Sequence, residues 1–178
     1  MMRLGYLFFL LFSAETVLLF ASCGDNAIQK SQTIVGTFEE EKVSLNQEIV
    51  RREHADIALI AKRYNWNLLQ DSSGFFYEVL NKTAGNFPKT KDRVTIKGKI
   101  YLQDGTEVYN ENVDGVKEFV INRSDDPVGL HELLKLMREG EKSRAIIPSY
   151  LAYGISGDGV EIPALSVLIC EIELVKIN

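Results

Sequence analysis

The feature that most constrains the fold of this chain is the alternation of mainly apolar and mainly polar residues over positions 93–102. One set of alternate positions holds Val94, Ile96, Gly98, Ile100 and Leu102, and the other set holds Thr95, Lys97, Lys99 and Tyr101. A period of two is the period of a β-strand that buries one face. The pair Asp104-Gly105 follows directly and is typical of a tight turn between antiparallel strands. The segment therefore predicts an antiparallel sheet with one face in a core.

Most of the chain after residue 73 has the same strand-like pattern, and one short segment differs. We expect strands over residues 76–82, 93–102, 106–110, 116–122, 142–147 and 167–177. A helical spacing of i, i+3, i+4, i+7 relates Leu130, Leu133, Leu134 and Met137. We expect Asp125 or Asp126 to cap this helix and Gly140 to end it. A helix with one apolar face needs a sheet to cover it, so the predicted class is α+β, an antiparallel sheet curved around one short helix.

A longer helix is expected before the sheet. Ser44 and Gln47 have the spacing of a capping box, and helical spacing relates the apolar residues Ile49, Ile57, Ile60 and Tyr64. This pattern predicts a helix over Leu45–Tyr64 that packs on one side only, against the sheet or against another copy of the chain. Residues 24–42 have no sustained period and are expected to form a tether. The predicted parts are a tether at 23–42, a helical segment at 43–72 and a domain at 73–178.

The first 22 residues have the pattern of a secretory signal. Arg3 precedes two apolar runs, and small residues lead to Cys23. The stretch LFASC resembles the lipobox of bacterial lipoproteins, which implies removal of residues 1–22 and a lipid on Cys23. The alternative is an uncleaved anchor, since Leu4 to Ser22 is long enough to span a bilayer. Glu15 would then lie near the bilayer centre at a cost of a few kcal/mol, so we favour the lipoprotein.

Composition limits the remaining function classes. The net charge is −5, and a chain without a basic excess is not expected to bind nucleic acid. Two cysteines and two histidines leave no pattern for a metal cluster. We expect His54 and His131 to be surface helix residues and Cys170 to be an unpaired cysteine in the core.

The C-terminal segment 151–177 carries the motifs that identify a family. Tyr153-Gly154, a glycine-containing loop, Ile162-Pro163 and a last strand ending in Glu173-Leu174-Val175-Lys176 follow one another without a gap. This order resembles the C-terminal signature of the FK506-binding-protein (FKBP) family of peptidyl-prolyl isomerases, and the resemblance extends over about residues 75–177. The signal, the helix and the segment 73–85 further resemble the gliding-motility-associated isomerase lipoproteins of Bacteroidetes.

The resemblance implies an FKBP-like fold, an activity and a site. The activity is rotation of X–Pro peptide bonds, which needs an apolar pocket and a few hydrogen-bond donors but no metal or cofactor. The implied pocket residues are Tyr153, Ile162, Phe119, Val108, Tyr109 and Leu130. Tyr153 would donate a hydrogen bond to a ligand carbonyl, while Ile162 and Phe119 would form walls. Phe119 and Val108 are equally compatible with plain core packing.

Several positions depart from the family pattern. Val108 stands where the family usually has Phe, and Leu130 stands at the Trp of the pocket floor. The pocket Asp falls at Tyr109, a strand Tyr falls at Gly98 and a core Phe falls at Cys170. We expect a shallower pocket and weaker isomerase activity, and we propose that Tyr109 replaces a missing aromatic wall.

The sequence therefore favours an isomerase and leaves a second function open. The expected partners are proline-containing polypeptides and, through Cys23, a bacterial membrane. The expected location is the cell envelope, with the outer membrane favoured and the domain in the periplasm or on the surface. The alternative is a non-catalytic peptide-binding or chaperone module on the same fold, as part of a motility or secretion machine. The oligomeric state is left open.

Overall fold

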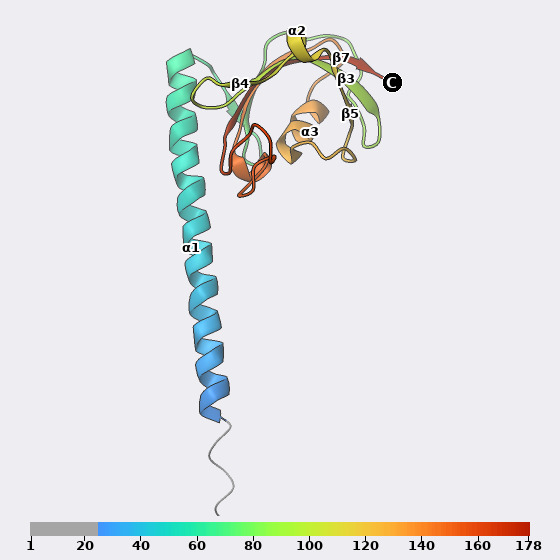
Figure 1. Cartoon of the computed structure of the whole chain (residues 1–178). Helices are drawn as coiled ribbons and strands as arrows, with labels where there is room; N and C mark the ends of the chain where they lie inside the picture. The colour runs from blue at the N-terminus through green and yellow to red at the C-terminus, as the bar shows by residue number, and fades with distance from the viewer. Residues whose placement is uncertain (1–24) are drawn as a thin grey trace, which may run out of the picture. The chain divides into compact units, whose positions relative to one another are not determined.

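The computed structural model describes the backbone of residues 25–178 and the side chains of residues 40–178 (Figure 1). The predicted signal segment 1–22 and the proposed lipid site Cys23 lie outside the described residues. The chain divides into two compact units, residues 1–47 and 48–178. The second unit contains the sheet and every predicted pocket residue.

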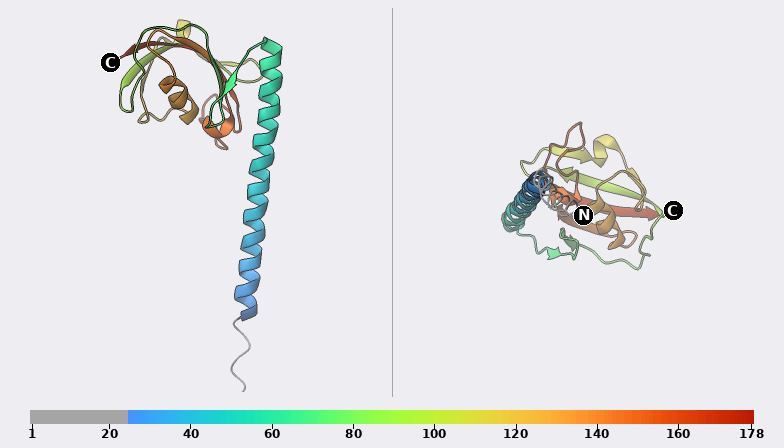
Figure 2. Two further views of the ribbon diagram at one scale, coloured as in Figure 1. Left: turned by 180° about the vertical axis from the view of Figure 1, so that it is seen from behind. Right: turned by 90° about the horizontal axis from the view of Figure 1, so that it is seen from below.

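Seven antiparallel strands form one sheet that curves around a short helix (Figure 1). The strands are β1 (Leu69–Gln70), β2 (Phe76–Val79), β3 (Arg93–Tyr101), β4 (Glu107–Asn110), β5 (Lys117–Val120), β6 (Lys142–Ile147) and β7 (Leu168–Ile177). Their order in the sheet is β1-β2-β6-β7-β3-β4, and β5 also pairs with β3. The helix inside the curve is α3 (Val128–Lys135), and Figure 2 shows the same enclosure from behind and from below. The predicted α+β architecture is confirmed.

Strand β3 has the alternating pattern that the sequence predicts. Its alternate residues Val94 and Ile96 are fully buried, and the strand pairs with β7 from Val94 to Tyr101. The predicted turn follows, because the Leu102 N–H donates to the Thr106 carbonyl at 2.8 Å. Gly105 has a φ of 91°, a conformation that favours glycine. The hairpin therefore forms where Asp104-Gly105 indicates it.

The apolar face of α3 is confirmed, but both of its predicted ends are wrong. All four residues of the face are buried, namely Leu130, Leu133, Leu134 and Met137. Pro127 is the N-cap and no side chain caps the helix, since Asp126 pairs with Lys117 at 2.8 Å instead. The helix ends at Lys135, before Gly140, whose N–H donates to the Leu174 carbonyl in the turn that leads into β6. Asp126 and Gly140 thus interact with residues outside the helix, and neither of them caps or ends it.

Helix α1 spans Asp25–Tyr64 and begins earlier than the predicted Leu45. The residues expected to be a tether are helical from Asp25 onward, because their Gln, Glu and Lys residues are good helix formers even without an apolar period. Within the second unit, Ile57 and Ile60 pack on a small apolar cluster formed by β6, β7 and their neighbours. The members of this cluster are Ile57, Ile60, Ile146, Val167 and Ile169, with Trp66, Leu68, Phe76 and Tyr101 at its edge. The predicted one-sided packing of the helix is therefore confirmed for residues 48–64.

Both histidines are wrongly predicted as surface residues. His131 is 4% exposed because the loop after β5 covers its ring. Its Nδ1 accepts from the Asn122 N–H at 3.3 Å, so the Nε2–H faces the Ser124 carbonyl at 3.2 Å. His54 is half-buried and packs edge-on against Phe76, with ring centroids 5.5 Å apart. The partners of His131 lie in the loop before its helix and Phe76 lies beyond the helix of His54, so helical spacing indicates neither contact.

Among the described residues, no group of three or more His, Cys, Asp or Glu side chains is arranged to hold a metal ion. No helix in that part of the chain has both the length and the apolar character that crossing a membrane requires.

Candidate functional site

The structure brings all six predicted pocket residues to one apolar cluster on the concave side of the sheet. They come from β4, β5, α3 and the loop before β7, and they are Val108, Tyr109, Phe119, Leu130, Tyr153 and Ile162. Phe119 and Leu130 are each 1% exposed, whereas Val108 and Tyr153 are half-buried. The first two therefore lie beneath the surface, and the latter two lie at the edge of the cluster.

Tyr153 is held by a short 3-10 helix, η1 (Ser149–Leu151), that precedes it. The Ser149 carbonyl accepts from the Ala152 N–H at 3.0 Å and from the Gly154 N–H at 2.9 Å. These two residues flank Tyr153 on both sides. Gly154 has a φ of 61°, which is the left-handed conformation that glycine adopts at low cost. The backbone of the tyrosine is thus fixed by local hydrogen bonds.

The Tyr153 hydroxyl is an available donor. Burial raises its pKa above the ordinary value of 10.0, and the carboxylates of Asp126 and Asp158 raise it further. The group therefore stays protonated at neutral pH. Within the described part of the chain, no group accepts a hydrogen bond from it. A ligand carbonyl at this edge of the cluster can accept that hydrogen bond.

Ile162 is positioned by the carboxylate of Asp158. One oxygen, Oδ1, accepts from the backbone N–H groups of Val160 at 2.9 Å, Glu161 at 3.0 Å and Ile162 at 2.7 Å. Desolvation acts to raise the pKa of Asp158, but these three hydrogen bonds outweigh it and lower the pKa below the ordinary value. The tight loop therefore fixes the residue that the resemblance assigns to a pocket wall.

Tyr109 lies in the core with its hydroxyl already engaged. It is 9% exposed, and its hydroxyl donates to the Gly115 carbonyl at 2.8 Å. Burial raises its pKa, and the nearby carboxylates of Glu111 and Asp114 add to this shift. The aromatic ring belongs to the same cluster as Val108, which precedes it in β4. Its role as a substitute wall stays a prediction.

A charged pair beside Phe119 was not predicted from the sequence. The Lys117 ammonium lies 5.1 Å from the centroid of the Phe119 ring and 2.8 Å from an oxygen of Asp126. The Asp126 side chain is only 15% exposed and is close enough to Tyr153 to raise its pKa. The edge of the apolar cluster therefore carries one cation and one carboxylate. Nothing in the sequence indicates this pair, since Asp126 reads there as a helix cap.

Glu53 of α1 is the second residue that the sequence interpretation missed. It is 6% exposed and accepts hydrogen bonds from Ser149, the residue that begins η1. A signal was present, because position 53 falls on the apolar stripe of the helix between Ile49 and Ile57. A carboxylate on a buried stripe indicates a specific partner, since an unpaired buried charge is costly.

Gly98 stands where the family has a strand Tyr, and the backbone at this position excludes a side chain. Gly98 has a φ of 140°, and a Cβ at this position would lie 2.0 Å from the Glu171 carbonyl oxygen. No side chain fits there, so β3 cannot carry the strand Tyr of the family at this place. Cys170, at the other departure on β7, is fully buried, which confirms it as a core cysteine.

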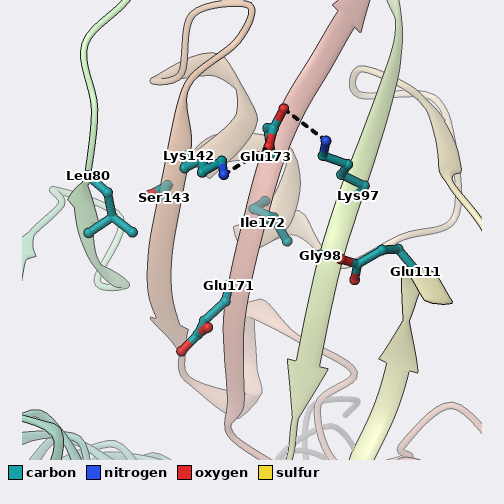
Figure 3. Close-up of a pocket in the computed structure, with 9 residues that line it drawn as sticks. All are labelled: Leu80, Lys97, Gly98, Glu111, Lys142, Ser143, Glu171, Ile172 and Glu173. Carbon is teal, nitrogen blue, oxygen red and sulfur yellow. Dashed lines mark ion pairs between the residues drawn. The ribbon is translucent and has the colours of Figure 1, made fainter.

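Two hollows on the surface lie away from the six residues. The larger one, of about 360 Å³, is on the outer face of the sheet, where Glu173 pairs with Lys97 at 3.3 Å and with Lys142 at 3.5 Å (Figure 3). Its lining residues are Leu80, Lys97, Gly98, Glu111, Lys142, Ser143, Glu171, Ile172 and Glu173. The other hollow, of about 230 Å³, lies between residues 102–104 and 163–167. Neither hollow is lined by a predicted pocket residue.

Known proteins resemble this chain in sequence. The macrophage infectivity potentiator of Trypanosoma cruzi is 29% identical over 161 residues, which cover 90% of this chain and 79% of that protein. The FKBP-type 22 kDa peptidyl-prolyl cis-trans isomerase of Escherichia coli strain K12 is 38% identical over 107 residues, which cover 59% of this chain and 50% of that protein. This chain thus matches only half the length of the latter relative.

Structural similarity and a family model agree with these sequence matches. The crystal structure of FkpA from Escherichia coli has a TM-score of 0.60 and 28% identity, covering 88% of this chain and 74% of that chain. The model of the FKBP-type peptidyl-prolyl cis-trans isomerase family matches residues 84–175, more than half of the 178 residues. These residues include β3 to β6, α3, the Tyr153 loop and most of β7. The chain therefore belongs to the FKBP-type peptidyl-prolyl cis-trans isomerase family.

Proposed function

We propose that the chain catalyses cis–trans isomerisation of X–Pro bonds at the edge of the apolar cluster, beside Tyr153. The observation that carries the proposal is the Tyr153 hydroxyl, which is protonated and half-buried and has no hydrogen-bond acceptor among the residues that the structure describes. Rotation of the peptide bond has a barrier of roughly 18–20 kcal/mol, because resonance favours the planar amide. The twisted amide has less charge separation than the planar one, so an apolar surface favours it.

The residues at this edge have separable roles in the proposed reaction. The apolar side chains of Ile162 and Val108 would contact the proline ring and exclude water from the amide. The Tyr153 hydroxyl would hold a flanking carbonyl and thereby fix the orientation of the bound segment. No proton transfer or covalent step is required, so the chemistry places no demand for a base or nucleophile.

The test is an isomerisation assay on X–Pro peptides, by NMR exchange or by a protease-coupled reading, with the chain from Gly24 onward. Wild-type protein should accelerate exchange, and Tyr153→Phe should lower kcat/KM by roughly three- to ten-fold, the loss of one neutral hydrogen bond. Tyr64→Phe is the matched control, because Tyr64 is 50% exposed on α1. Equal rates for wild-type and Tyr153→Phe protein would contradict the proposed role of the hydroxyl.

A second candidate function is a non-catalytic peptide-binding or chaperone module. The near-complete burial of Phe119 and Leu130 favours it, because these residues offer little surface to a proline ring. Such a module would suppress aggregation of unfolded chains without accelerating proline isomerisation. The same protein preparation tests both functions, since acceleration of isomerisation and suppression of aggregation are measured independently.

We further infer that the protein acts in a bacterial envelope, held to a membrane by a lipid on Cys23, where it assists the folding of envelope or secreted proteins. Support comes from the lipobox-like stretch LFASC and its apolar leader. Labelling of cells with a tagged fatty acid should mark the wild-type chain and leave Cys23→Ser unlabelled. Label on both chains would contradict attachment at Cys23.

A further inference from the structure

The inference concerns Glu53, a buried carboxylate that the proposed reaction does not use. It lies in the C-terminal part of α1 and is 6% exposed. One oxygen, Oε2, accepts from the Ser149 N–H at 3.0 Å, and the other, Oε1, accepts from the Ser149 hydroxyl. The two residues are 96 positions apart in the chain. Both hydrogen bonds of this carboxylate thus serve a single residue at the start of η1.

Ser149 connects Glu53 to the backbone on either side of Tyr153. Its N–H and hydroxyl are taken by Glu53, while its carbonyl accepts from the N–H groups of Ala152 and Gly154. Ser149 is itself 1% exposed, so water does not replace these partners. A displacement of Ser149 would therefore move both neighbours of the tyrosine.

A second contact of η1 is made with the turn before β2. The Tyr150 hydroxyl lies directly over Gly74, in the turn before β2, where a Cβ would come within 2.1 Å of it. Gly74 has a φ of 108° and leaves room for the phenol. The contacts of η1 with Glu53 and Gly74 therefore come from parts of the chain outside the residues that the family model matches, whereas α3, which also contacts η1, lies within them.

Packing of α1 on the sheet does not explain why a carboxylate is buried at position 53. Ile57 and Ile60 already bury the helix against Ile146 and Ile169. A buried charge is a poor stabiliser compared with an apolar residue of similar size, because its desolvation offsets its hydrogen bonds. Removing one partner from such an arrangement, in contrast, leaves the other partner buried and unsatisfied. The carboxylate thus specifies where Ser149 sits more than it adds to stability.

We propose that Glu53 is a positioning residue for Tyr153, acting through Ser149, so that helix α1 is part of the apparatus that orients the tyrosine. The expected effect on kcat/KM rests on the proposed function. The contacts between Glu53 and Ser149 do not depend on it. Loss of the carboxylate should let η1 open locally and lower the fraction of molecules in which the hydroxyl is correctly placed.

The test compares Glu53→Ala, Glu53→Gln and Ser149→Ala with Asp56→Asn, whose residue is an exposed carboxylate on the same helix. Amide hydrogen exchange at Ala152 and Gly154 should be about ten-fold faster in Glu53→Ala, the loss of a charge-assisted hydrogen bond. The amides of β7 and all amides of Asp56→Asn should match wild type. Glu53→Gln keeps the size and one acceptor oxygen, so its exchange should lie between wild type and Glu53→Ala.

The kinetic arm uses the same proteins and the X–Pro assay. Glu53→Ala should lower kcat/KM by about ten-fold, and Glu53→Ala combined with Ser149→Ala should be no slower than the slower single variant, because both remove one shared interaction. Additive losses would overturn the proposed route through Ser149. Wild-type exchange at Ala152 and Gly154 in both Glu53 variants, or faster exchange with unchanged kcat/KM, would overturn the positioning role.

Failure of the proposed function is distinguishable from failure of this inference. If wild-type protein does not accelerate isomerisation, the proposed function fails, while the exchange arm still decides whether Glu53 holds the Tyr153 segment. If wild-type protein is active and Tyr153→Phe is impaired, wild-type behaviour of Glu53→Ala and Glu53→Gln in both arms overturns the inference alone.

Discussion

At the scale of single residues, three carboxylates determine the surroundings of Tyr153: Glu53 is buried, Asp126 is half-buried and Asp158 is exposed. Asp126 raises its pKa, Asp158 holds the loop that follows it, and Glu53 holds the turn that precedes it. Each of these carboxylates comes from a different segment of the chain. The chemistry at the tyrosine is therefore a product of tertiary structure, even though Tyr153-Gly154 is recognisable as a local motif.

The first prediction concerns Asp126→Asn. Removing this charge should lower the pKa of Tyr153 toward its ordinary value of 10.0, without reaching it, because burial is the larger cause of the shift. The measurement is a pH titration of the Tyr153 ring carbon by NMR. Asp125→Asn is the control, since Asp125 is exposed and adjacent. An unchanged titration in Asp126→Asn would show that this carboxylate does not act on the tyrosine.

Sequence and structure differ at this scale for a physical reason. Cys170 and the apolar face of α3 could be predicted because burial follows local periodicity. His131 and Asp126 could not, because their partners lie in preceding segments and no spacing relates them. The position of Glu53 on the apolar stripe indicates a buried partner but does not identify it as Ser149. The six pocket residues were assigned by a family resemblance, and the structure shows that they meet in one cluster, not that they form an open pocket.

At the scale of elements, the loop from Tyr153 to Ile162 depends on one carboxylate. The carboxylate of Asp158 accepts three backbone hydrogen bonds, which orders a segment that has no regular secondary structure. Its lowered pKa means that the folded loop binds the ionised form more strongly than the protonated form. Stabilisation by this group is complete above the unfolded pKa of about 4 and is lost as the pH falls through the lower, folded value.

The second prediction follows from the lowered pKa of Asp158. The amide signals of Val160 and Ile162 should stay constant from neutral pH to about pH 4 and shift below it, as Asp158 becomes protonated. Asp158→Asn should remove this acid transition, because the amide side chain keeps an acceptor oxygen but does not titrate. Glu161→Gln, an exposed substitution in the same loop, should retain it. Persistence of the transition in Asp158→Asn would assign it to another group.

Element boundaries show which sequence signals are reliable. Strand β3 and the sheet-facing side of α3 were predicted because alternation and helical spacing report burial directly. The predicted start of α1 was wrong, since residues 25–42 form a helix although their apolar residues have no sustained period. The cap of α3 was wrong because Asp126 pairs with Lys117, 9 positions before it, instead of with its own helix. Local rules fail where a tertiary partner competes for the same side chain.

At the scale of the whole molecule, β7 is the strand that joins the two parts of the sheet. It pairs with β6 on one side and with β3 on the other. Cys170 lies in this strand, is fully buried, and has its pKa raised by burial to about 12. A thiol in this environment is neutral at physiological pH and inaccessible, so it does not react while the sheet is intact.

The third prediction uses this thiol as a probe of global stability. In the chain from Gly24 onward Cys170 is the sole cysteine, and labelling by iodoacetamide at pH 8 should be slow and should accelerate with denaturant in step with unfolding. Circular dichroism measured on the same samples provides the comparison. Rapid labelling in native buffer would show that β7 opens without unfolding of the domain.

The position of β7 has a consequence for biosynthesis. Strands β1, β2 and β6 lie on one side of it and β3, β4 and β5 on the other, yet all six leave the ribosome before it does. The edges of β6 and β3 that pair with β7 therefore stay unpaired until β7 has emerged from the ribosome. The seven-stranded sheet therefore becomes complete only after β7, the last of its strands in the sequence, has been synthesised.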